Sequence, residues 1–92
     1  MIRNFRHRGL KRLFEQQDRS RVNAVDAEKI ERILTHLDNA PTVRHMALPR
    51  FHLHPMKADY KGFWSVTVRA NWRVIFRFKD GDAFDVDLLD YH

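Results

Sequence analysis

The last quarter of the chain constrains the fold most, because it holds two runs of alternating apolar and polar residues around an Asp-Gly pair. Apolar side chains stand at every second position from Trp72 to Phe78, and again from Phe84 to Leu88. Such alternation buries one face of a strand and leaves the other in water. Asp80-Gly81 between the runs is a strong hairpin signal. We therefore predict an antiparallel β-hairpin at this end of the chain.

The length of the hairpin loop decides the register. A two-residue loop at Asp80-Gly81 would pair Phe78 with Ala83 and Phe76 with Asp85, which mixes apolar and charged residues on one face. A slip of one residue turns every side chain to the opposite face, so we predict the three-residue loop 80–82. The predicted pairs are Phe78–Phe84, Phe76–Val86 and Val74–Leu88. This register sets Arg77 against Asp85 and carries residues 90–92 past the end of the sheet, near Trp72 and Arg73.

Upstream of the hairpin, helical spacing of apolar residues predicts two helices. The first spans residues 9–17, with Leu10, Leu13 and Phe14 on one face. We expect Asn23 to cap the second, with Asp26 at its third helical position near the positive end of the helix dipole. Asn39-Ala40-Pro41 stops this helix.

Alternation predicts further strands over residues 51–54 and 64–69, and residues 1–5 suit a short edge strand. Residues 42–50 fit a loop, and Pro55 ends regular pairing or marks a sheet edge. A turn around Ala70 gives the pairs Val68–Trp72, Val66–Val74 and Trp64–Phe76, which stack apolar residues on one face.

These elements predict one α+β domain over residues 1–92. Its antiparallel sheet has a short N-terminal strand and a four-strand C-terminal meander, with the two N-terminal helices packed on one face. The opposite face is then open, concave and basic. We expect this open face to carry Thr67, Arg69, Arg73 and Arg77, with His52 and His54 as neighbours.

Composition narrows the class of protein. The chain has no cysteine, which leaves no disulfide or thiolate metal site and is compatible with a reducing compartment. Residues 2–13 are broken by basic side chains and do not form a signal peptide, and no apolar run has the length of a membrane span. The expected location is the cytoplasm, without membrane association.

Charge is unevenly distributed along the chain. Residues 42–79 contain eight Lys or Arg and one Asp, whereas residues 80–92 contain five Asp and neither Lys nor Arg. A basic middle favours an anionic partner such as RNA, DNA or an acidic protein. A solvated surface neutralised in part by the acidic tail explains the same pattern, so charge alone does not separate the two interpretations.

The open face gathers residue types suited to cutting RNA without a metal. That reaction needs a base for the 2′-hydroxyl, an acid for the leaving 5′-oxygen and a cation for the crowded phosphorus. Histidine suits the first two tasks because its reference pKa is near neutrality, and Lys or Arg suits the third. His54, Lys57, Arg73 and the closing Asp90-Tyr91-His92 provide these types.

Each of these residues also has a structural interpretation. His54 fits an ordinary polar surface residue, and His52 and His54 with His45 or His92 would make a weak zinc site. Arg73 and Arg77 fit ion pairs with the aspartates of the tail across the hairpin. Asp90 fits a neutralising partner of Arg73, Tyr91 a core ring with a bonded hydroxyl, and His92 a fraying terminus.

Several segments together resemble the HigB toxins, the plasmid maintenance killer branch of the RelE/ParE superfamily. They are Phe5-Arg6-His7-Arg8-Gly9-Leu10-Lys11, Leu53-His54-Pro55-Met56-Lys57, Gly62-Phe63-Trp64-Ser65-Val66, Asn71-Trp72-Arg73-Val74, Phe76-Arg77-Phe78, Asp85-Val86-Asp87 and Asp90-Tyr91-His92. Each is a weak motif alone, but in this order and at these spacings they are specific. The resemblance runs nearly end to end and implies a RelE-like fold.

The resemblance also implies an activity. HigB toxins are ribosome-dependent endoribonucleases that cut mRNA in the decoding site of the small subunit, without a metal or other cofactor. By motif, His54, Asp90, Tyr91 and His92 match the catalytic set, and Lys57 and Arg73 match the cations that contact phosphate. On chemical grounds we expect one of His54 and His92 to act as base and the other as acid, Asp90 to orient a histidine, and Tyr91 to stack on or bond the substrate.

The implied partners are a HigA-type helix-turn-helix antitoxin, the ribosome with its mRNA, and operator DNA reached through the antitoxin. Two other functions stay open. ParE-like relatives on the same fold inhibit DNA gyrase, and fold does not fix function. A non-catalytic module that binds nucleic acid or protein through its basic surface is the third possibility.

Overall fold

The computed structural model describes residues 1–91, with the helices before the strands as predicted. Two α-helices, α1 (Arg8–Gln16) and α2 (Ala27–Asn39), precede four strands. The strands are β1 (His54–Pro55), β2 (Trp64–Arg69), β3 (Trp72–Lys79) and β4 (Asp82–Asp90). Two short 3₁₀ helices, η1 (Val43–Met46) and η2 (Ala58–Tyr60), lie in the connections. The α+β class is confirmed.

The four strands form one antiparallel sheet in the order β1-β2-β3-β4. The predicted N-terminal strand is present as two isolated parallel bridges to β4, Ile2 with Ala83 and Phe5 with Val86. Backbone hydrogen bonds accompany these bridges, including Arg3 N–H to the Ala83 carbonyl at 2.8 Å and Arg6 N–H to the Val86 carbonyl at 2.8 Å. The N-terminal segment therefore covers the free edge of β4 over residues 83–86.

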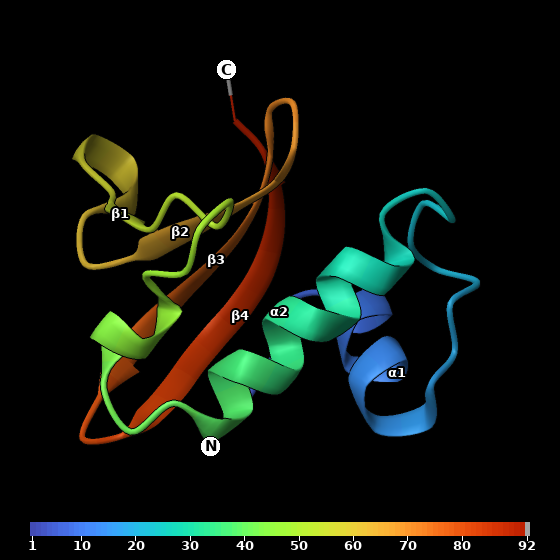
Figure 1. Cartoon of the computed structure of the whole chain (residues 1–92), viewed down its shortest axis with the longest axis horizontal. Coiled ribbons are helices and arrows are strands. Elements are labelled where there is room, and N and C mark those ends of the chain that lie inside the picture. Colours follow the sequence, from blue (N-terminus) through green and yellow to red (C-terminus); the bar gives the residue numbers. More distant parts are fainter. Residues whose placement is uncertain (92) are drawn as a thin grey trace.

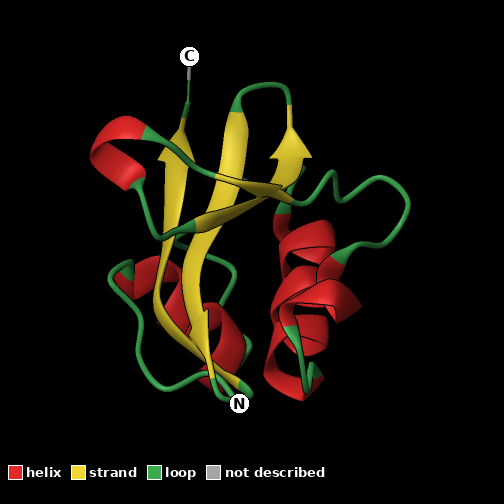
Figure 2. Ribbon diagram, turned by 90° about the vertical axis from the view of Figure 1, so that its left-hand side faces the viewer, coloured by secondary structure: helices red, strands yellow, loops and turns green. Residues whose placement is uncertain are grey.

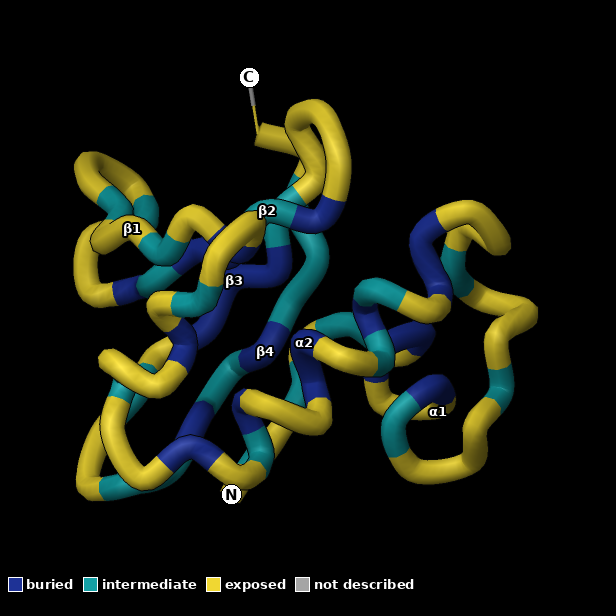
Figure 3. The backbone as a smooth tube through the Cα atoms, in the orientation of Figure 1, coloured by how far each residue is buried: buried dark blue, intermediate teal, exposed yellow. Residues whose placement is uncertain are grey.

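Both α-helices lie on the same side of the sheet (Figure 1), where α2 packs against β2 and β4, and α1 against β4 and α2. The main core lies between these layers, and Figure 3 shows that the strands and α2 each contain buried positions. Its largest fully buried side chains include Leu10, Leu13, Ile30, Ile33, Leu34, Leu37, Met46, Val66, Val74, Phe76 and Val86. Complete burial of one such side chain stabilises a fold by roughly 1.5–3 kcal/mol.

The helix ends differ in part from the prediction. α1 begins after His7, whose Nδ1 accepts the Leu10 N–H at 3.1 Å, and it ends at Gln16, before Gln17 in a left-handed conformation. α2 begins at Ala27, so the predicted cap at Asn23 is wrong. Asn23 Oδ1 accepts the Val25 N–H at 2.9 Å and forms a separate turn before the helix. Neither helix is both long and apolar enough to cross a membrane, a finding that covers residues 1–91.

The hairpin prediction is right about the strands and wrong about the loop. Lys79 pairs with Asp82 and Phe78 with Ala83, so the loop is the two-residue Asp80-Gly81. Its φ values are 52° and 82°, the left-handed pair that a type I′ hairpin turn requires. Further from the loop the register shifts, and Val74 pairs with Leu88 as predicted.

A bulge between these two registers reconciles them. The shift falls between Ile75 and Arg77, and on the facing strand Asp85 has φ 53°. The extra residue lets the tight turn form without carrying its register to the far end of the sheet. The Asp85 carboxylate lies 3.5 Å from Arg77 Nε. The two residues therefore meet as an ion pair, as expected, although Arg77 is paired in the sheet with Phe84.

A second irregularity in the sheet places Arg69 differently from the prediction. The predicted pairs Val66–Val74 and Trp64–Phe76 are confirmed, but Trp72 pairs with Arg69 instead of Val68. The register shifts between Thr67 and Arg69. The Arg69 guanidinium then bonds the Asp26 carboxylate beside α2, with Nε 2.7 Å from Oδ1. Arg69 is therefore absent from the open face on which it was expected.

The predicted strand over residues 51–54 is mostly wrong, since β1 contains only His54 and Pro55. Arg50 and His52 have φ values of 74° and 50°, and this left-handed backbone cannot continue an extended strand. Residues 42–50 also contain the short helix η1 in place of a plain loop.

The open face is partly covered. Residues 56–63, which include η2, connect β1 to β2 and lie on the side of the sheet away from α1 and α2 (Figure 1). Phe63 and Ile75 are 4% and 1% exposed and stand outside the main core cluster. η2 and the C-terminal end of β4 lie at the same end of the sheet (Figures 1 and 2).

Candidate active site

A depression of about 560 Å³ opens on the sheet face opposite the helices. Its walls come from β1 and the residues after it, from the polar faces of β2 and β3, and from the residue that follows β4. The lining residues are His52, His54, Pro55, Met56, Lys57, Ser65, Thr67, Arg73 and Tyr91. Four of the six residues predicted for the site are thus brought to one place, from positions far apart in the chain.

Sheet pairing explains this convergence. His54 stands opposite Ser65 across β1 and β2, and Thr67 stands opposite Arg73 across β2 and β3. Residues that face each other in an antiparallel sheet project from the same face. The Tyr91 N–H donates to the Asn71 carbonyl at 2.9 Å, which brings the end of the chain to the β2–β3 turn.

One hydrogen bond orients the His54 ring and assigns its tautomer. Its Nδ1 lies 2.7 Å from the His52 carbonyl oxygen. A carbonyl oxygen only accepts, so we assign the proton to Nδ1. In neutral His54, Nε2 then carries the lone pair that a general base needs. In protonated His54, Nε2 carries the proton that a general acid needs. This carbonyl belongs to His52, whose left-handed backbone interrupts the predicted strand.

The two predicted phosphate contacts, Lys57 and Arg73, lie on the same depression. Arg73 Nη1 donates to the carbonyls of Ala70 at 2.6 Å and Trp72 at 3.2 Å, which fixes the guanidinium at the β2–β3 turn. No acidic side chain is found among the described residues that line the depression. Two cations without a lining carboxylate favour an anionic group there.

The closing triplet is divided. Tyr91 lines the depression and is 45% exposed. Its ring meets the Tyr60 ring edge to face, with centroids 6.4 Å apart. Asp90 is the last residue of β4, is paired with Trp72 and is not among the lining residues. The predicted catalytic residue His92 lies outside the described residues.

The sequence analysis did not propose three of the lining residues, Pro55, Met56 and Ser65, as site residues. Ser65 is 7% exposed and stands across the sheet from His54. Its position on the polar side of the alternating run 64–69 was a usable signal. The position of Met56 had none, since it depends on a hydrogen bond from the Met56 N–H to the Phe63 carbonyl, which extends the pairing of β1 with β2.

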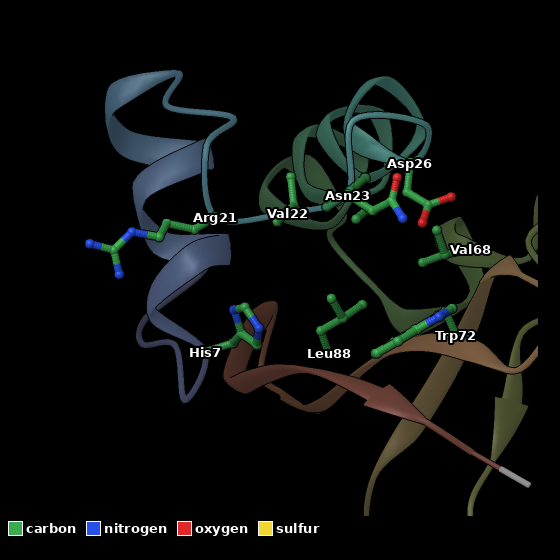
Figure 4. Close-up of a pocket in the computed structure, with 9 residues that line it drawn as sticks. His7, Arg21, Val22, Asn23, Asp26, Val68, Trp72 and Leu88 are labelled. Atoms are coloured by element: carbon green, nitrogen blue, oxygen red, sulfur yellow. The ribbon is translucent and has the colours of Figure 1, made fainter.

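A second cavity, of about 200 Å³, lies on the helix side of the sheet. Figure 4 shows Trp72, Leu88 and Val68 on its sheet side, and the loop before α2 above them, with the Arg21 side chain pointing away. It contains none of the predicted site residues. Within residues 1–91, no three His, Cys, Asp or Glu side chains come close enough together to hold a metal ion.

Comparison with known proteins identifies the family. Residues 3–92 match the model of a family described as RelE-like toxin of type II toxin-antitoxin system HigB. The chain belongs to the HigB-like toxin family. It is also 45% identical over 92 residues, the whole of both chains, to Endoribonuclease HigB of Proteus vulgaris. The resemblance found in the sequence motifs is thereby confirmed.

Membership of the HigB-like family agrees with the fold and implies a partner. A two-helix layer on a four-strand antiparallel sheet is compatible with a RelE-like domain. A toxin of a type II system has a cognate antitoxin.

Proposed function

We propose that this HigB-like chain is an endoribonuclease that cuts mRNA in the decoding site of the ribosome. The 45% identical relative is named an endoribonuclease, and the match extends over the full length of both chains. The proposed reaction is attack by a ribose 2′-hydroxyl and needs no metal. Because the proposed substrate is mRNA on the ribosome, the proposed site of action is the cytoplasm.

The observation that carries the proposal is the convergence of His54, Lys57, Arg73 and Tyr91 on one depression. These are a proton-transfer group, two cations and an exposed aromatic ring. The first two kinds serve phosphoryl chemistry, and the third serves the binding of single-stranded RNA. A surface that served solubility alone would not require all three kinds of residue in one depression.

In the proposed reaction, a base removes the proton of the 2′-hydroxyl, and the 2′-oxygen attacks the adjacent phosphorus. The bond from phosphorus to the 5′-oxygen breaks, and an acid protonates that oxygen. The products are a 2′,3′-cyclic phosphate and a 5′-hydroxyl. His54 performs one of the two proton transfers at Nε2 while Nδ1 remains bonded to the His52 carbonyl. We assign the other transfer to His92, on the strength of the family motif.

The remaining residues take supporting roles. Lys57 and Arg73 stabilise the negative charge that develops on the phosphate oxygens, which is where preorganised cations contribute most. The exposed Tyr91 ring offers a stacking surface for a base. We propose that Asp90 orients a histidine of the site.

The proposed partners follow from the family. The antitoxin is of the helix-turn-helix HigA type, and through it the pair reaches operator DNA. The toxin alone acts on the translating ribosome.

The decisive experiment maps the 5′ ends of cellular mRNA after controlled expression of the wild type, His54→Ala, His92→Ala and His45→Ala. His45 is the matched control, since its Nδ1 bonds Thr42 Oγ1 at 2.9 Å and it does not line the depression. New ends confined to translated frames in the wild type and His45→Ala, and absent from the other two, would support the proposal.

Two other results would reject parts of it. Toxicity without new mRNA ends, equal in all four proteins, would favour the gyrase inhibitor or the non-catalytic module. A 5′-phosphate at the cut would favour a hydrolytic reaction assisted by a metal.

A further inference from the structure

Three aromatic rings connect the interior of residues 56–63 to the depression. The Phe63 and Tyr60 rings meet edge to face with centroids 6.4 Å apart, and the Tyr60 and Tyr91 rings do so at the same separation. Phe63 is 4% exposed and Tyr91 is 45% exposed. Tyr60 therefore stands between a buried ring and a ring of the candidate active site, although it does not itself line the depression.

The buried end of this chain of rings is firmly anchored. The Arg77 guanidinium carbon lies 4.4 Å from the Phe63 ring centroid, and that of Arg6 lies 5.2 Å from it. Both guanidinium groups also pair with Asp85, at 3.5 Å and 3.8 Å. Cation–π contacts of this geometry are attractive, and the shared carboxylate holds both cations on the ring. Phe63 is thus fixed from β3 and from the N-terminal segment.

The exposed end needs such support. Tyr91 follows the last residue of β4. Residues beyond the last strand lose order easily unless tertiary contacts hold them. Its backbone is tied to Asn71, and the contact of its ring with Tyr60 restrains the side chain.

From this arrangement we propose that Tyr60 is a positioning residue that holds the Tyr91 ring at the rim of the depression. Edge-to-face contact fixes both the place and the tilt of a ring. The anchor at Phe63 transmits this restraint from the sheet to the site. The consequence for catalysis rests on the proposed function, whereas the restraint on Tyr91 does not.

The restraint is tested by NMR on the intact chain, with the wild type, Tyr60→Phe, Tyr60→Leu and Tyr60→Ala. We expect cross-peaks between the rings at positions 60 and 91 in the wild type and in Tyr60→Phe. The side-chain order parameter of Tyr91, measured at its ring carbons, should fall in Tyr60→Leu and Tyr60→Ala but not in Tyr60→Phe. Tyr60→Leu retains apolar bulk beside Phe63, so it covers the case in which the alanine variant does not fold. An unchanged Tyr91 in all variants would overturn the proposal.

The effect on activity is tested by a double-mutant cycle that measures cleavage of ribosome-bound mRNA in a single turnover. Tyr60→Leu should lower the rate about 3- to 10-fold, the range of an aromatic pair, and Tyr60→Phe should restore it to within about 2-fold. In a Tyr91→Ala background, Tyr60→Leu should have no further effect, because the ring that it positions is gone. Equal losses in both backgrounds would contradict the positioning role.

The two failures are distinguishable. If the wild type cleaves no RNA while the rings still depend on each other in the NMR spectra, the proposed function is wrong and the positioning role stands. If the wild type cleaves RNA and Tyr60→Leu changes neither Tyr91 nor the rate, the positioning role is wrong and the proposed function stands.

Discussion

Arg69 and Asp26 form a bidentate pair that connects the end of β2 to the start of α2. Arg69 Nε lies 2.7 Å from Asp26 Oδ1, and Nη2 lies 3.1 Å from Oδ2. The Asp26 side chain is 8% exposed and that of Arg69 is 47% exposed. Hydrogen bonding to Asp26 raises the pKa of Arg69. The Arg69 guanidinium therefore provides the nearly buried Asp26 carboxylate with hydrogen bonds that water would otherwise provide.

Removal of one member should destabilise the fold more than an ordinary surface change. In Arg69→Met the Asp26 carboxylate loses its partner in a largely dry position, and we expect a loss of about 1–2 kcal/mol in the free energy of unfolding. Urea denaturation measures it. Arg32→Met, on the outer face of α2, is the control. The depression lies on the other face of the sheet, so mRNA cleavage by the folded variant should be unchanged. If Arg69→Met were as stable as the wild type, the pair would make no net contribution to the free energy of unfolding.

Lys57 should matter where a neighbouring lysine does not. Lys57 lines the depression, whereas Lys61, in the same connection, does not. Lys57→Gln should lower the rate of mRNA cleavage about 10- to 100-fold, the range of one charge-assisted contact. Lys61→Gln should stay near the wild type. Single-turnover cleavage of ribosome-bound mRNA measures both. Similar rates for the two variants would remove Lys57 from the proposed site.

Replacement of Gly62 by alanine should disturb both the fold and the candidate active site. Its φ is +96°, and a Cβ built on it would lie 2.9 Å from Arg77 Nη1, the guanidinium that lies over Phe63. Gly62→Ala should lower the free energy of unfolding by more than about 1 kcal/mol and should also reduce cleavage.

The matched control is Gly81→Ala, in the hairpin loop. Gly81 has a similar φ of +82°, but its nearest neighbour would be 3.6 Å away. This variant carries the backbone strain without the clash. It should lose stability and retain cleavage, and a loss of cleavage equal to that of Gly62→Ala would show that strain alone explains both.

Asp82 should make stability depend on pH in the acid range. Partial burial opposes its ionisation, but contacts with Arg3 at 3.1 Å and the Met1 ammonium at 3.4 Å hold its pKa below the ordinary 3.8. The stability from these contacts is complete above about pH 4 and is lost as the pH falls through the lowered pKa. Asp82→Asn should therefore be less stable than the wild type near neutral pH and equal to it in strong acid. Urea denaturation at both pH values decides this.

The sequence predicted the parts of the fold that depend on local pattern. Helical spacing located both helices within a few residues, and alternation located β2, β3 and β4. Phe76 and Val74 are buried as the alternating pattern requires. The gathering of His54 and Arg73 followed from the order of the strands alone.

Two of the errors, the hairpin register and the strand over residues 51–54, share one physical cause, a left-handed residue other than glycine. Asp85 produces the bulge that lets the two-residue loop coexist with the Val74–Leu88 register. His52 interrupts the predicted strand and precedes the carbonyl that holds His54. Long-range contacts maintain such conformations, as when Asn4 bonds Asp85 at 2.8 Å from the other end of the chain. Neighbouring residues in the sequence give no sign of them.

The N-terminal segment and Pro55 have a joint consequence for how other molecules meet this toxin. Residues 1–6 pair with the backbone of β4 over residues 83–86, at one margin of the sheet. At the other margin β1 has two residues, and one is a proline without an N–H. A foreign chain therefore finds little backbone available for strand addition at β1 or at residues 83–86 of β4, and these two places resist stacking of copies into aggregates.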